Sequence, residues 1–135
     1  MPSELEPVFA GLRLILQKHA GTFAVIDDSP RAYGLEGHPG PATLRAWGGK
    51  VRRPRIPVAW VRLGKAYVSF HLMALDGSPK LHAGMSPQLK ARMQGRTCFN
   101  FKKSDEPLFQ ELDGITARGL AAFRDAGFVA DAGSA

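Results

Sequence analysis

The chain has few of the features that identify a protein class from sequence alone. It contains a single cysteine, Cys98, among 135 residues, so no disulfide can form within the chain and a reducing compartment, the cytoplasm, is expected. No apolar run approaches the ~18 residues that a membrane-spanning helix requires, which predicts a protein without a membrane partner. The N-terminus carries acidic residues before its apolar ones, whereas a secretory signal peptide has a basic start.

Recognisable metal and nucleotide motifs are also missing. The four histidines, His19, His38, His71 and His82, show none of the paired spacings that are typical of metal sites. The glycine-rich segment 34–41 (GLEGHPGP) lacks the lysine and the following helix of a phosphate-binding loop. We therefore expect no metal site and no cofactor.

Acidic residues are nearly absent from the middle of the chain. From Gly37 to Lys103 the sequence contains thirteen lysines and arginines but only one acidic residue, Asp76. A positive field of this kind attracts phosphates, carboxylates or nucleic acid. A basic surface that serves solubility alone is the alternative, because net charge does not specify a partner.

Length and composition predict one folded domain. A chain of 135 residues with 44% hydrophobic residues is long enough to bury a core without disulfides. We expect a single domain over residues 1–135, with residues 128–135 as a frayed tail.

Amphipathic helices are predicted at both ends of this domain. Ser3 and Glu6 have the spacing of a capping box, and apolar residues recur every three or four positions over residues 5–19. The final helix is expected to begin at Ser104 as its cap and to end at Gly127, with a similar apolar stripe.

Alternating apolar and polar residues predict strands between the two helices. The glycine and lysine at 64–65 favour a tight hairpin between two of them. The five predicted strands cover residues 22–27, 31–36, 58–63, 66–73 and 97–102, with a weaker candidate at 43–47.

A short helix is expected before the last strand. Ser86 is a suitable N-cap, Leu89 and Met93 are one turn apart, and Gly95 marks the end. Hairpin connections imply an antiparallel sheet, and two amphipathic helices require only one sheet face. We therefore predict a two-layer α+β domain of about five mostly antiparallel strands, with the terminal helices on one face and a short helix between the last strands.

The same alternation divides the side chains between two sheet faces. The face toward the helices is predicted to receive Ala66, Val68, Phe70, Leu72, Phe99 and Phe101. The opposite face is predicted to receive Trp60, Arg62, Tyr67, Ser69, His71, Cys98, Asn100 and Lys102.

This second set is the candidate binding site. It combines hydrogen-bonding groups, one imidazole and fixed cations, and Trp47 or Trp60 can supply a wall. We therefore predict a non-enzymatic binding module for a small anionic ligand or a protein partner. A homodimer interface is a further alternative, and so is a polar surface that only covers the solvent side of the sheet.

Two other functions are compatible with the same residues. The basic loop Lys50–Arg55 and the aromatic residues of the strands suggest single-stranded nucleic-acid binding. Cys98 is a candidate nucleophile or redox sensor if Lys102, Arg96 and His71 lower its pKa. An orienting carboxylate for the histidine, which such catalysis needs, is absent nearby in the sequence.

Two segments carry a resemblance to a known group. Residues 61–73 (VRLGKAYVSFHLM) and 86–103 (SPQLKARMQGRTCFNFKK) resemble a bacterial family of small uncharacterised proteins related to the domain of unknown function 1801 group, labelled frataxin-like or iron chaperone. The resemblance spans roughly residues 5–127 and implies a compact α+β domain without an established reaction. Its label implies metal chaperoning as one more alternative, whereas iron as a hard cation prefers carboxylate clusters.

Overall fold

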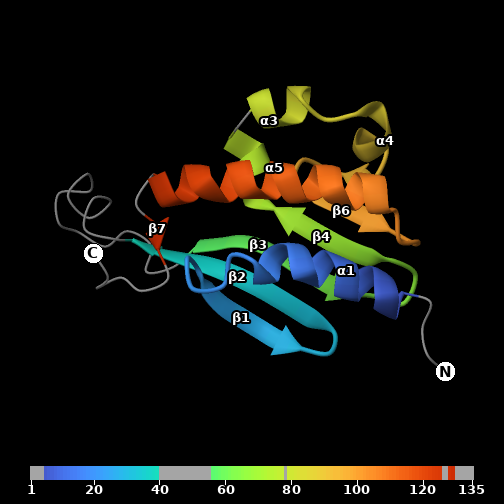
Figure 1. The fold of residues 1–135 in the computed structure, drawn as a ribbon, viewed down its shortest axis with the longest axis horizontal. Coiled ribbons are helices and arrows are strands. Elements are labelled where there is room, and N and C mark those ends of the chain that lie inside the picture. The colour runs from blue at the N-terminus through green and yellow to red at the C-terminus, as the bar shows by residue number, and fades with distance from the viewer. Residues whose placement is uncertain (1–4, 40–55, 78, 126–127, 130–135) are drawn as a thin grey trace.

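Two helices and one sheet form the two layers of the protein. The computed structural model describes residues 5–39, 56–77, 79–125 and 128–129. Helices α1 (Glu6–Gln17) and α5 (Glu106–Asp125) lie side by side against one face of an antiparallel sheet (Figure 1). The predicted α+β class and the packing of both terminal helices on one sheet face are therefore confirmed.

The sheet has the strand order β1-β2-β3-β4-β6-β5, and its described pairings are antiparallel. A further short strand, β7, pairs with the end of β2. The strands are β1 Ala24–Ser29, β2 Ala32–Pro39, β3 Ile56–Leu63, β4 Val68–Leu72, β5 Met93–Gln94, β6 Cys98–Phe101 and β7 Phe128–Val129. The sheet has more strands than the predicted five because β5 and β7, of two residues each, are too short to give a periodic signal in the sequence.

Three short helical elements connect β4 to the last part of the sheet. They are η1 Met73–Gly77, α3 Pro79–Ala83 and α4 Pro87–Lys90. Only α4 was predicted. It begins as expected, because the Ser86 side chain accepts a hydrogen bond from Leu89 N at 3.1 Å.

The core lies between the helices and the facing side of the sheet. Phe70 is fully buried, and its neighbours across the strands are Val61 and Phe99, also fully buried. The ring of Phe101 meets that of Phe109 on α5 edge to face, with centroids 5.2 Å apart. The predicted core assignment of Val68, Phe70, Leu72, Phe99 and Phe101 is confirmed.

Several predicted boundaries were wrong. Ala66 is exposed, because the chain leaves the strand after Leu63 and re-enters it only at Val68. Met93 is not part of α4, which ends at Lys90, and it begins β5. Phe128–Val129 pairs with β2, so these two residues do not belong to a frayed tail.

The helix caps also differ from the prediction. Asp105 caps α5, since its carboxylate accepts a hydrogen bond from Leu108 N at 3.2 Å, so Ser104 is not the cap. The N-cap of α1 is Leu5, which has no capping side chain. Ser3 and the candidate strand at 43–47 lie outside the described residues.

Glu111 joins α4 to α5. Its two carboxylate oxygens accept hydrogen bonds from Ser86 N at 2.7 Å and Ser86 Oγ at 2.6 Å. Charge-assisted hydrogen bonds of this kind are stronger than neutral ones. The segment that leads into β5 and β6 is therefore held directly against the core helix.

Gly119 marks the closest approach of α5 to η1. A Cβ atom at this position would lie 2.9 Å from the Cβ of Ala74, and Ala74 has no flexible side chain that could move aside. We expect Gly119→Ala to destabilise the protein by about 1–3 kcal/mol through overpacking, measured by urea unfolding.

Gly114 in the same helix provides the matched control. A Cβ atom there has Arg118 Nη1 as its nearest neighbour, at 3.7 Å. Gly114→Ala should therefore stabilise the protein by up to about 1 kcal/mol through helix propensity. Equal effects of the two substitutions would contradict the close approach at Gly119.

Candidate functional site

No described helix covers the second face of the sheet, which we call the open face. Two rows of residues cross it through strands β3, β4 and β6. The first row is Trp60, His71 and Cys98, and the second is Arg62, Ser69 and Asn100. The prediction that these six residues share one face is confirmed by the register of the strands.

The first row is a set of closely packed neutral groups. The rings of Trp60 and His71 are stacked, with centroids 4.6 Å apart and planes inclined by 14°. Cys98 Sγ lies 3.6 Å from His71 Nε2 and 3.5 Å from Asn100 Oδ1. Partial burial lowers the pKa of His71, and the nearby charge of Arg62 lowers it further. The imidazole is therefore neutral at physiological pH.

Cys98 has the opposite character from the one proposed for a reactive thiol. Burial raises the pKa of its thiol, whereas a nucleophilic or redox-sensing cysteine needs a lowered pKa. His71 is neutral and contributes no positive charge that would counteract burial. The hypothesis of a reactive thiol required a lowered pKa of Cys98, and the direction of the shift is the opposite.

The second row supplies the permanent positive charge of the open face. Arg62 is exposed, and within the described part of the chain no carboxylate lies at ion-pair distance from it. Its neighbour across the strands is Ser69, which in turn pairs with Asn100. A cation is thus placed beside a hydroxyl group and a carboxamide.

A hollow of about 420 Å³ lies where β3 turns into β4. We call it the hairpin hollow. Its polar lining includes Arg62, Lys65, Tyr67 and Ser69. Two basic residues and two residues that carry hydroxyl groups therefore line one hollow, and its volume falls within the range of small-molecule sites.

The hairpin depends on a glycine. Gly64 N donates a hydrogen bond to Tyr67 O at 3.0 Å, which closes the turn. A Cβ atom at position 64 would lie 2.8 Å from that same carbonyl oxygen, so any other residue forces the turn open. Lys65 lies within this turn and Arg62 on β3, and both residues line the hairpin hollow.

A second hollow of about 250 Å³ adjoins Arg62 on the side of β1 and β2. We call it the ring hollow. It is lined by Ile26, Asp27, Pro57, Trp60 and Arg62. Arg62 therefore borders both hollows.

The remaining candidate residues lie at the margin of this site. Tyr67 is outside β4 and 41% exposed, and it contributes to the hairpin hollow. Lys102 is exposed directly after β6 and lines neither hollow. Trp47 and the basic loop 50–55 lie outside the described residues.

Sequence reasoning missed Lys65, Asp27 and Ile26. The sequence pattern places Lys65 only in a turn, although its position three residues after Arg62 in a tight hairpin was an available signal. Asp27 and Ile26 come from β1, which is two strands away from β3. Their proximity to Trp60 follows from strand order, which the sequence pattern does not reveal.

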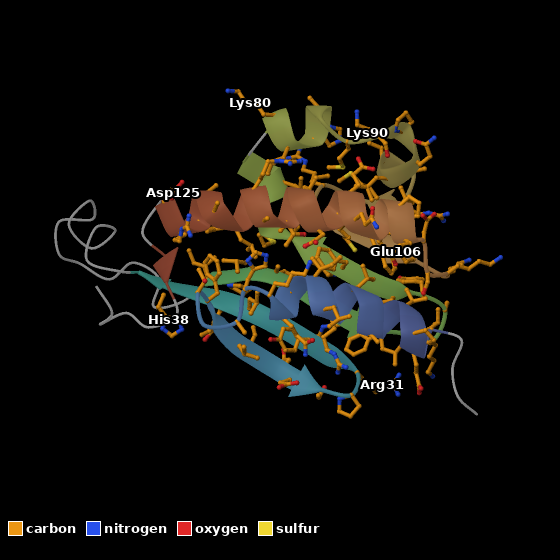
Figure 2. All side chains as sticks on the ribbon, viewed as in Figure 1. Arg31, His38, Lys80, Lys90, Glu106 and Asp125 are labelled. Atoms are coloured by element: carbon orange, nitrogen blue, oxygen red, sulfur yellow. The ribbon has the colours of Figure 1, made fainter. Side chains whose placement is uncertain are left out.

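The basic residues of the central segment do not all gather on the open face. Lys80 on α3 and Lys90 on α4 lie beyond α5, at the margin of the molecule farthest from β1 (Figure 2). What distinguishes Arg62 and Lys65 from the other basic residues is that they line one hollow together. The overall positive charge of the segment does not distinguish them.

Within the described residues there is no group of three or more His, Cys, Asp or Glu that could hold a metal ion. None of the described helices is both long and apolar enough to cross a membrane.

Comparison with models of protein families, with curated proteins and with solved structures finds no match for this chain. The resemblance of residues 61–73 and 86–103 to the domain of unknown function 1801 group therefore stays a prediction.

The lowered pKa of His71 has a consequence for stability. As the pH falls, the unfolded chain takes up a proton at about pH 6.5, before the folded protein does. Stability is therefore greatest above this pH and falls below it. We expect His71→Gln to flatten the loss of melting temperature between about pH 7.5 and about pH 5.5.

Part of the slope should persist in this variant, because burial also lowers the pKa of His19. His82 on α3 is exposed, so His82→Gln serves as the matched control and should retain the full slope. If the melting temperature of the native protein and of His71→Gln fell equally with pH, the attribution of this pH dependence to His71 would be wrong.

The raised pKa of Cys98 predicts a slow thiol. Because only the thiolate reacts, Cys98 in the folded protein should be alkylated by iodoacetamide at least about threefold more slowly than free cysteine at neutral pH. Unfolding in urea should restore the rate of free cysteine. A folded protein that reacts faster than free cysteine would instead revive the thiol hypothesis.

Proposed function

We propose that the protein is a non-enzymatic binding module for a small anion, a phosphate monoester or a carboxylate, which occupies the hairpin hollow. The observation that carries this proposal is that Arg62 and Lys65 line a single hollow together with Tyr67 and Ser69, two residues that carry hydroxyl groups.

The electrostatic argument rests on the unpaired charge of these cations. Arg62 and Lys65 are both exposed, and within the described residues neither has a carboxylate partner. A guanidinium group can donate two parallel hydrogen bonds to a phosphate or carboxylate, and a lysine adds a point charge. An anion between the two side chains reduces their mutual repulsion.

The neutral first row supports binding rather than thiol catalysis. Cys98 has a raised pKa and His71 a lowered one, so the pair supplies neither a thiolate nor an imidazolium at neutral pH. A nucleophilic cysteine requires a lowered pKa. Trp60, His71 and Cys98 instead form a neutral row beside Arg62.

Single-stranded nucleic acid is less well supported as the ligand. Sheets that bind such strands present several exposed aromatic rings on which successive bases stack. Phe99 and Phe101 are fully buried on the helix side, and His71 covers one side of the Trp60 ring. The described open face therefore offers only the other side of Trp60 and the exposed ring of Tyr67, which is fewer stacking surfaces than a run of successive bases uses.

The proposal is tested by a small panel of anions. Ribose 5-phosphate, phenyl phosphate and citrate, each at millimolar concentration, are compared with uncharged ribose by thermal shift and calorimetry. At least one anion should bind, and Arg62→Gln should weaken that binding about tenfold or more, because a hydrogen bond to a charged group contributes about 1.5–3 kcal/mol.

Arg118→Gln is the matched control, since it removes the same charge from an exposed position on α5. This variant should bind the anion as the native protein does. Equal weakening by both substitutions would indicate a general charge effect, and no binding of any anion would reject the proposed function.

A further inference from the structure

The ring hollow is a second feature of the open face that the proposed function does not use. It lies on the opposite side of Arg62 from the hairpin hollow, and both hollows include this arginine in their lining. A ligand held by Arg62 can therefore extend into either one.

One wall of the ring hollow is the indole of Trp60. His71, on β4, covers one side of that indole by stacking. Strand β2 lies on the other side of β3, and there Trp60 pairs with Gly34, which has no side chain. The second side of the indole is therefore not covered by a residue of the adjacent strand.

Gly34 allows the strand beyond it to contribute instead. A Cβ atom at position 34 would lie 2.9 Å from Ile26 Cγ1 and 3.2 Å from Trp60 Cβ. Its absence lets Ile26 lean across β2 toward Trp60. Together with Pro57, these side chains give the ring hollow apolar walls around one aromatic surface, which is the environment that planar rings prefer.

Asp27 gives the ring hollow an acidic residue among its lining residues. A carboxylate there disfavours an anionic group, which Arg62 and Lys65 attract instead. The same carboxylate can accept a hydrogen bond from an amino group on a ring. Asp27 has a φ of 55° at an irregularity of β1, a conformation that aspartate and asparagine tolerate better than most residues.

The spacing of the two hollows agrees with one ligand. Trp60 and Arg62 are two residues apart on β3, which corresponds to about 7 Å along a strand. A nucleoside monophosphate, whose sugar stands between its ring and its phosphate, has the length to span such a separation. The ring hollow, at about 250 Å³, is smaller than a complete ligand pocket of roughly 300–1,000 Å³, as expected for a subsite that holds one ring system.

We propose that the ligand of this protein is a small anion that carries a planar ring, of the nucleoside monophosphate class, with its phosphate in the hairpin hollow and its ring against Trp60 in the ring hollow. This inference rests on the proposed anion-binding function and adds the second half of the ligand.

The experiment compares two probes that carry the same anion, AMP and ribose 5-phosphate, by calorimetry. AMP should bind about fivefold or more tightly than ribose 5-phosphate, because a base stacked on an aromatic side chain strengthens binding by about this factor or more. Trp60→Leu should remove this difference, so that the variant binds the two probes with affinities within about twofold of each other. In a Trp47→Phe background, AMP should also quench the fluorescence of Trp60, and ribose 5-phosphate should not.

A second pair of variants covers the case in which Trp60→Leu does not fold. Ile26→Ala shortens a side chain of the ring hollow, whereas Val25→Ala changes the adjacent residue of β1, which lines neither hollow. Only Ile26→Ala should reduce the preference for AMP.

The outcomes separate the two proposals. Equal affinities for AMP and ribose 5-phosphate, both weakened by Arg62→Gln, would overturn the ring subsite and leave the anion site in place. If neither AMP nor ribose 5-phosphate binds but another anion of the panel does, the nucleotide ligand is rejected and the anion site stands; if no anion binds, both proposals are rejected. Much tighter binding of a single-stranded oligonucleotide than of AMP would overturn the assignment of a small ligand in favour of nucleic acid.

Discussion

The register between β3 and β4 is the constraint on which the other features depend. Because side chains alternate between the faces of a strand, the pairing of Val61 with Phe70 places both in the core and simultaneously places Arg62 beside Ser69 on the open face. A shift by one residue would bury the arginine and expose the phenylalanine. The hydrophobic free energy of the core, at roughly 1.5–3 kcal/mol for each buried large apolar side chain, therefore also determines the arrangement of the polar site. The tight turn at Gly64 connects the two strands in this same register.

Much of the architecture could be predicted because it follows from local periodicity. The apolar stripes of α1 and α5 and the alternation over Val68–Leu72 and Cys98–Phe101 were sufficient for the α+β class and for the division into two faces. The errors occur where periodicity gives no information. The cap of α5 is decided by which of two adjacent capable residues, Ser104 or Asp105, reaches Leu108 N. Met93 continues a helical spacing but joins β5 through backbone pairing with β6, which is a tertiary interaction.

The candidate site was predicted only in part, and for the same reason. Six of its residues lie on three adjacent strands, so alternation within each strand was enough to place them together. The two hollows depend instead on the turn geometry at Gly64 and on the missing side chain of Gly34, which links β1 to β3. The protonation states of His71 and Cys98 in the first row could not be predicted from the sequence either, because they depend on burial. Burial keeps His71 and Cys98 neutral, and this leaves permanent charge to Arg62 and Lys65, which remain in contact with solvent.

The irregularity of β1 at Asp27 and the shortness of β5 concern the outer edges of the sheet. Exposed edge strands invite pairing with another chain, and proteins prevent it with short strands, charges and bulges. Within the described residues, β5 offers only Met93 and Gln94 at one edge, and β1 at the other is interrupted between Ile26 and Ser29, where Asp27 and Asp28 stand. Neither edge gives a neighbouring chain a long, regular ladder of hydrogen bonds. The described part of the sheet can therefore leave one face without a covering helix while its edges resist aggregation by strand addition.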